Sequence, residues 1–307
     1  MTKSNNKNGL IELFRFLCSV WVAYFHGFFP ILSDEFGGGN IAVDFFFMVS
    51  GLFFLKSIEK YRERPFSEGV KFIFWGRTKR FIVPLIIAAL SILYCNIMFK
   101  LEFNGFNWPF SFLWFFAAQF VFLTFFYFLL RRIKSLSVLN ISCIIVIFIS
   151  IFISLFVAPP IKAPCRGPAM VAIGMLLSQI PQISIKSKDE LRSKRLTLTV
   201  NAIGFALAAF LFIFVAYLPR FATGKIYIFD FVACTSLLYF ASALPVRSKF
   251  LNLLGEFSVF IYLGQCPILL HHYYVSRDTR EQFIPLCICA IALFAINRIV
   301  NKARLIK

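Results

Sequence analysis

The chain has 307 residues, of which 60% are hydrophobic and 15% are charged. Soluble domains contain roughly 45–50% apolar and about 25% charged residues. This composition therefore excludes a soluble domain, a disordered chain and a disulfide scaffold. The 32 Lys and Arg against 14 Asp and Glu give a net charge of +18. These cations form clusters between apolar runs instead of a stripe on one face, which argues against nucleic-acid binding and favours a membrane protein.

Ten apolar runs follow one another along the chain, each near the 20 or so residues that a membrane-spanning helix needs. The polar start, MTKSNNKNGL, has no small-residue cleavage site after the first run, so that run is predicted to be a retained span. The sequence thus predicts an all-α integral membrane protein with one membrane-embedded domain over residues 1–307. The predicted spans are 10–30, 41–57, 79–99, 110–130, 138–158, 166–181, 196–218, 226–245, 257–275 and 282–300.

The connectors between these runs predict the orientation of the chain. With the N-terminus inside, the inner connectors contain 24 Lys and Arg and the outer connectors contain 7. Cytoplasmic loops are enriched in Lys and Arg, so both termini are predicted to be cytoplasmic. The longest inner connectors, about 57–78 and 182–195, are too short to fold alone.

The first run contains the ionisable residues Arg15 and His26 deeper than its first turn. Ionisable groups are costly in a bilayer, so both are functional candidates. At about 100° per residue, positions eleven apart lie on one face of a helix. Two plainer alternatives stay open. Arg15 could extend to the membrane interface, and His26 could make a hydrogen bond between helices.

The second run contains Asp44 near its outer end, at about the predicted depth of His26. A carboxylate beside an imidazole raises its basicity and fixes its tautomer. This pattern predicts a pair of Asp44 and His26. The alternative is that Asp44 lies near a helix start because the helix dipole favours an acidic residue there.

A dense cationic stretch, FWGRTKR, leads into the third run and contains Arg77, Lys79 and Arg80. Arginine binds phosphate through two parallel hydrogen bonds, so the stretch is a candidate phosphate site. Ordinary positive-inside signalling explains it equally simply. Among the later runs, Arg166 begins the sixth and Asp230 lies in the eighth.

Taken in order, these residues resemble the motifs of the acyltransferase-3 family, bacterial inner-membrane enzymes that O-acylate surface polysaccharides. The opening motif of that family, a basic residue and then histidine after ten more residues, is matched by Arg15 and His26. Glu12 matches the acidic residue three positions before the arginine. Further matches are the AVDFFFMVSG stretch at 42–51 with Asp44 and Ser50, the basic start of the third run with Arg77, Arg80 and Pro84, Arg166 with GMLL at 174–177, and Ser258, Tyr262, Leu263 and Pro267 in the ninth run.

One departure from the family pattern lies in the ninth run, where Gln265 replaces a histidine that many members have. Tyr262 and Gln265 are three residues apart and so share a helix face. Glutamine can make hydrogen bonds but cannot shuttle a proton near neutral pH. If that position is catalytic in relatives, its role here is reduced or replaced.

The resemblance implies acetyl-CoA as the acyl donor, no metal, and a glycan or lipid-linked glycan as acceptor, such as lipopolysaccharide O-antigen, capsule or exopolysaccharide. It also implies a multi-pass protein of the bacterial inner membrane. His26 would be the general base or an acyl relay, and Asp44 would orient its ring. The CoA phosphates would be bound by Arg15, Arg77, Lys79 and Arg80, with substrate or structural support from Glu12, Ser50, Arg166, Tyr262 and Gln265.

Two other functions fit an apolar chain with buried ionisable groups. A secondary transporter uses such groups as proton relays, although no inverted repeat is detectable here. A glycan flippase or polymerase without acyl chemistry has a similar composition.

Overall fold

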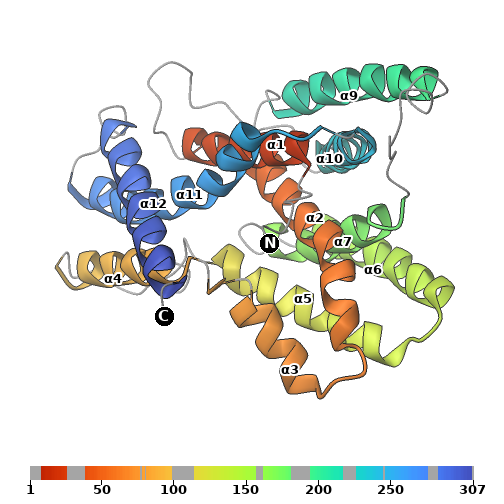
Figure 1. The fold of residues 1–307 in the computed structure, drawn as a ribbon, viewed down its shortest axis with the longest axis horizontal. Coiled ribbons are helices and arrows are strands. Elements are labelled where there is room, and N and C mark those ends of the chain that lie inside the picture. The colour runs from red at the N-terminus through yellow and green to blue at the C-terminus, as the bar shows by residue number, and fades with distance from the viewer. Residues whose placement is uncertain are drawn as a thin grey trace.

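The computed structural model describes residues 8–25, 39–76, 78–79, 81–98, 114–156, 162–180, 194–216, 226–244, 246–275 and 283–305, which form helices and no strand. The predicted all-α class is confirmed for these residues. Figure 1 shows the helices α1 (Gly9–Phe25), α2 (Gly39–Ile58), α3 (Phe66–Lys71), α4 (Ile82–Met98), α5 (Trp114–Arg132), α6 (Leu136–Phe156), α7 (Lys162–Leu177), α9 (Arg195–Ala216), α10 (Ile226–Ala243), α11 (Lys249–Val275) and α12 (Phe283–Leu305), with short turns at η1 (Glu59–Tyr61) and η2 (Phe72–Gly76).

Each of the ten predicted spans coincides with one of these helices. Within the described residues, five helices are long and apolar enough to cross a membrane. The other five predicted spans correspond to α1, α4, α7, α10 and α11, whose crossing stays a prediction. The five candidate spans are Ile41–Tyr61, Trp114–Arg132, Leu136–Phe156, Arg195–Ala216 and Ile284–Lys302.

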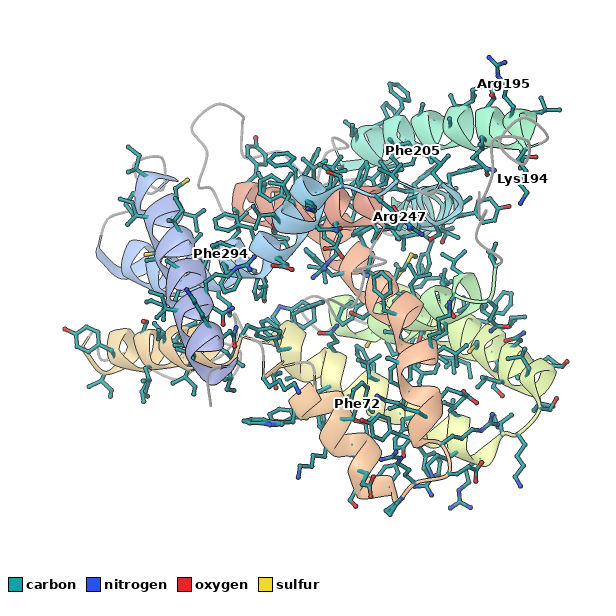
Figure 2. All side chains as sticks on the ribbon, in the orientation of Figure 1. Phe72, Lys194, Arg195, Phe205, Arg247 and Phe294 are labelled. Carbon is teal, nitrogen blue, oxygen red and sulfur yellow. The ribbon has the colours of Figure 1, made fainter. Side chains whose placement is uncertain are left out.

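The outer helices expose large apolar side chains over most of their length. In α6, α9 and α12, 17% of the candidate span is buried, and Phe148, Phe210 and Ile299 are each about 70% exposed. Figure 2 shows side chains along the outer face of α9 extending away from the rest of the protein, with Lys194 and Arg195 at the beginning of the helix. An apolar surface of this extent would aggregate in water, whereas in a bilayer it contacts lipid.

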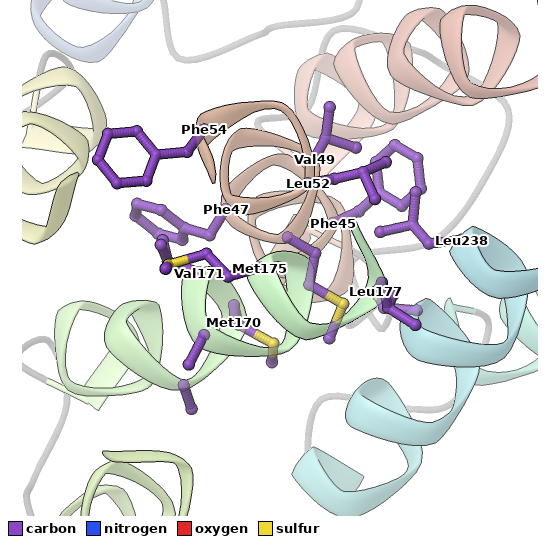
Figure 3. Packing of buried hydrophobic residues seen from close by; sticks show 14 of the residues in the cluster. Phe45, Phe47, Val49, Leu52, Phe54, Met170, Val171, Met175, Leu177 and Leu238 are labelled. Carbon is purple, nitrogen blue, oxygen red and sulfur yellow. The ribbon is translucent and has the colours of Figure 1, made fainter. Parts of the chain in front are cut away.

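At the centre, α2 is the most buried candidate span, at 67% of its length, and α7 packs along it (Figure 3). Small residues bring the two backbones into contact. A Cβ at Gly174 would collide with the carbonyl oxygen of Met48, and a Cβ at Gly51 would collide with that of Val171. Small residues are common where membrane helices pack closely, because van der Waals contact drives their association.

Helix α1 packs along α11, which also contacts α4 and α12 (Figure 1). The backbone N–H of Gly9 donates at 2.8 Å to the carbonyl of Val246, three residues before the start of α11. Further along, Ala23 and Ile261 belong to one buried cluster. The N-terminal part of α1 therefore lies beside the N-terminal part of α11, and the later parts lie together as well, so the two helices run in the same direction.

The predicted orientation can be tested with reporter fusions. Because Lys and Arg favour the inner connectors by 24 to 7, reporters placed after residue 65 and at the C-terminus should be cytoplasmic. A reporter near residue 36 should be external. An external C-terminus would contradict the ten-span order and the cytoplasmic side assigned to the donor.

Candidate active site

Three charged side chains from distant parts of the chain meet inside the protein. Arg166 of α7 lies 3.3 Å from Asp44 of α2 and 3.6 Å from Asp230 of α10, measured from Nη1 to the nearer carboxylate oxygens. The side chains of all three are at most 5% exposed. Buried charges persist when they are paired, and here the single guanidinium of Arg166 is shared between two carboxylates in a charge triad that joins α2, α7 and α10.

The three residues of the charge triad lie at matching positions in their helices. Each is within the first six residues of α2, α7 or α10. In the predicted topology these are the second, sixth and eighth spans, which enter the membrane from the same side. The ion pairs thus join groups that the predicted order puts at one depth.

The charge triad gives Asp44 and Arg166 a contact that the sequence did not indicate. Asp44 was expected to face His26, which lies outside the described residues, so that pair stays a prediction. Arg166 was expected to support substrate or structure, and the structure places it against the Asp44 carboxylate. Asp230 was not among the predicted site residues, although a carboxylate in an apolar run is a recognisable sign of function.

A second polar group lies where α1 packs on α11. Arg15 Nη1 donates to Glu12 Oε2 at 2.8 Å, with Glu12 buried and the Arg15 side chain 28% exposed. Gly255 of α11 makes room for this pair, because a Cβ there would overlap the Glu12 carboxylate. Arginine has five N–H donors, so a guanidinium oriented by Glu12 still has donors for a ligand.

Helices α2 and α5 share a polar contact that involves another predicted site residue. The Gln119 amide donates to the Ser50 hydroxyl, and that hydroxyl donates to the Phe46 carbonyl at 2.9 Å. Ser50, one of the predicted support residues, therefore links α2 to α5. Its hydroxyl thus has a structural role in the packing of these two helices.

An aromatic group lies next to this contact and connects α2, α5 and α11. Phe115 has ring-centroid distances of 4.7 Å to Phe47 and 6.1 Å to Tyr262. Tyr262 also meets Phe116 edge to face at 5.6 Å. The ring of Tyr262, a predicted support residue, thus packs against α5.

Gln265 lies three residues beyond Tyr262 on α11 and is 2% exposed. Its Nε2 atom has no hydrogen-bond partner in the described part of the chain. Most buried polar side chains are hydrogen-bonded. Among the described residues the side-chain oxygens of Thr124, Ser242 and Asn252 are likewise buried and unmatched, and the unmatched atom of Gln265 differs from these in being an N–H donor.

The predicted phosphate site is described in part. Lys79 is exposed, three residues before the start of α4, and its backbone N–H donates to the carbonyl of Trp75 at 3.0 Å. Arg77 and Arg80 lie outside the described residues, as does His26. Whether the four predicted phosphate ligands converge stays a prediction.

Comparison with known proteins identifies one family. A family model described as an acyltransferase domain, Acyl_transf_3, matches residues 8–300, which is nearly the whole chain. No curated protein and no solved structure matches the chain.

Proposed function

This chain belongs to the acyltransferase-3 family, and on that premise we propose that it is a membrane O-acyltransferase. Its donor is acetyl-CoA from the cytoplasm. Its acceptor is a hydroxyl of a surface glycan or lipid-linked glycan, such as O-antigen, capsule or exopolysaccharide, at a bacterial inner membrane. Membership of the family supports acyl transfer as the reaction. The identity of the donor, the identity of the acceptor and the roles of individual residues are what we propose.

One contact supports this function more than any other. The rings of Phe14 and Phe45 lie 6.3 Å apart between centroids. Phe14 precedes Arg15 and Phe45 follows Asp44, so the helix turns that carry a cation and a buried carboxylate pack together. Arg15 itself pairs with Glu12, and Asp44 pairs with Arg166. A transferase that binds an anionic donor and activates a hydroxyl needs both groups.

The roles follow from the chemistry of each group. The guanidinium of Arg15, oriented by Glu12, binds a CoA phosphate together with Arg77, Lys79 and Arg80. His26 removes the proton from the acceptor hydroxyl, or accepts the acyl group first as a relay. Asp44 orients His26, and Arg166 holds the Asp44 carboxylate in place.

Replacement of Arg15 tests the donor site. Hydrogen bonds to charged groups contribute about 1.5–3 kcal/mol, so Arg15→Ala should weaken acetyl-CoA binding roughly 10- to 100-fold. Arg15→Lys should weaken it less, because it keeps the charge and loses the two-pronged geometry. Calorimetry on detergent-purified protein measures both dissociation constants.

Arg298→Ala is the matched control, since Arg298 is an exposed arginine that pairs with Glu256 at 2.8 Å. It should bind acetyl-CoA as the parent does. Parental affinity in Arg15→Ala would show that the donor phosphates bind elsewhere.

The overall proposal is tested by acetyl transfer itself. Purified protein should bind acetyl-CoA and release CoA, and cells that contain the protein should carry acetyl esters on a surface glycan. The comparison is made by NMR of the glycan from cells with and without the protein. An unchanged glycan together with no acetyl-CoA binding would rule the proposal out.

A secondary transporter is the second candidate, and the charge triad is the observation that favours it. Buried Asp and Arg side chains in membrane helices often mark ion pathways. Acetyl-CoA binding separates the two functions, because a proton-coupled transporter has no need for a CoA site.

A further inference from the structure

The buried amide of Gln265 indicates a ligand. Its side chain is 2% exposed, and Nε2 lacks an acceptor within the described residues. Leaving a buried donor unmatched costs free energy that an apolar side chain of the same shape would avoid. Because the unmatched atom is a donor, the missing partner is a hydrogen-bond acceptor.

The position of Gln265 along α11 identifies where that acceptor would lie. Gln265 is one turn beyond Ile261 and shares its face. Ile261 packs in one cluster with Ala23 of α1 and with Leu286 and Ala290 of α12. Since α1 and α11 run in the same direction, Gln265 lies near the level of Phe25, the residue before His26 in the sequence.

The described residues that directly precede this amide on α11 lie in the apolar interior of the protein. Leu263 and Gly264 next to it are buried, and Tyr262 packs against Phe116 of α5. A hydrogen bond in such surroundings is stronger than in water. The amide is neutral, so it stays a donor across the pH range.

We propose that Gln265 Nε2 donates a hydrogen bond to the acyl carbonyl oxygen of the donor, a catalytic role that rests on the acyl transfer proposed above. The acceptor hydroxyl oxygen forms a bond to the acyl carbon as its proton passes to the base, and the carbonyl oxygen becomes an oxyanion. When the carbonyl re-forms, the C–S bond breaks and CoA leaves as the thiolate, which takes up a proton. Gln265 stabilises the oxyanion and changes none of its own bonds.

The decisive variant is Gln265→Met, which keeps the length of the side chain and removes the donor. Loss of one oxyanion donor typically lowers kcat about 10²- to 10³-fold, so turnover should fall by that factor. Acetyl-CoA affinity should stay at the parental value, because the phosphates bind elsewhere. The melting temperature should stay equal or rise, since an unmatched polar group leaves the interior.

Gln179→Met is the matched control. Gln179 and Asn140 exchange two side-chain hydrogen bonds, at 3.0 and 2.7 Å, between the end of α7 and α6. Removing that satisfied pair should lower the melting temperature and leave turnover unchanged. Gln265→Met should thus lose turnover without losing stability, and Gln179→Met should lose stability without losing turnover.

The outcomes separate this role from the proposed function. If the parent neither binds acetyl-CoA nor transfers acetyl, the proposed function fails. If the parent is active and Gln265→Met keeps near-parental turnover, the oxyanion role is wrong and the acyltransferase stands. A Gln265→Met protein that does not fold would also contradict the role, because it would show that the amide has a structural partner. Gln265→His, which keeps an N–H donor, should recover part of the lost turnover.

Discussion

Replacement of Arg166 by methionine is expected to lower the free energy of unfolding by about 3–5 kcal/mol. The variant leaves the carboxylates of Asp44 and Asp230 buried without the guanidinium that lies 3.3 and 3.6 Å from them. Removing one partner of a buried pair is costly because the remaining charge has no compensation. Thermal or denaturant unfolding of the purified protein in detergent measures the loss.

Two comparisons show whether charge is the cause. Arg298→Met removes an exposed pair with Glu256, which should cost at most about 1 kcal/mol. Replacing both carboxylates by amides in the Arg166→Met background should restore most of the stability, because no unpaired charge is left. Equal stability of Arg166→Met and the parent would show that the charge triad contributes nothing to folding.

Asp230→Asn distinguishes the two arms of the charge triad. It leaves one carboxylate and one guanidinium, Asp44 with Arg166, so its effect on stability should be much smaller than that of Arg166→Met. The smaller loss of stability is expected because Asp230→Asn leaves no buried carboxylate without a guanidinium, whereas Arg166→Met leaves two. A plain loss of packing would not produce this difference, because Asn and Asp have nearly the same volume.

The helices could be predicted from the sequence, because an apolar run of about 20 residues can cross a bilayer only as a helix when its pattern excludes a β-barrel. All ten runs coincide with helices in the described residues. The short helix α3 and the turns η1 and η2 were not predicted. They lie in the 57–78 connector, where a search for long apolar runs has no signal.

The ion-pair partners of the buried charged residues could not be predicted from the sequence in this way. Position along a run predicts the depth of Asp44, Arg166 and Asp230, but which face of each helix meets which neighbour depends on packing. That packing is set by contacts such as Gly174 against Met48, which join segments more than 100 residues apart. The unmatched amide of Gln265 is likewise a property of its neighbours.

Replacement of His26 by alanine is expected to lower acyl transfer by about 10²- to 10⁴-fold, the usual cost of losing a general base. His26 shares a predicted helix face with Arg15 and follows α1 directly in the sequence. The variant removes the group that accepts the hydroxyl proton and leaves Arg15 with its partner Glu12. Donor binding should therefore persist while turnover is lost, which calorimetry and a transfer assay on the same preparation can show.

His272→Ala is the control for this variant, because it removes another imidazole from the chain, in the last turn of α11, that has no proposed part in the reaction. Its turnover should be parental. Near-parental turnover in a folded His26→Ala protein would assign His26 to helix packing. The general base would then be sought at Asp44, the carboxylate whose ion pair with Arg166 already holds it in the interior.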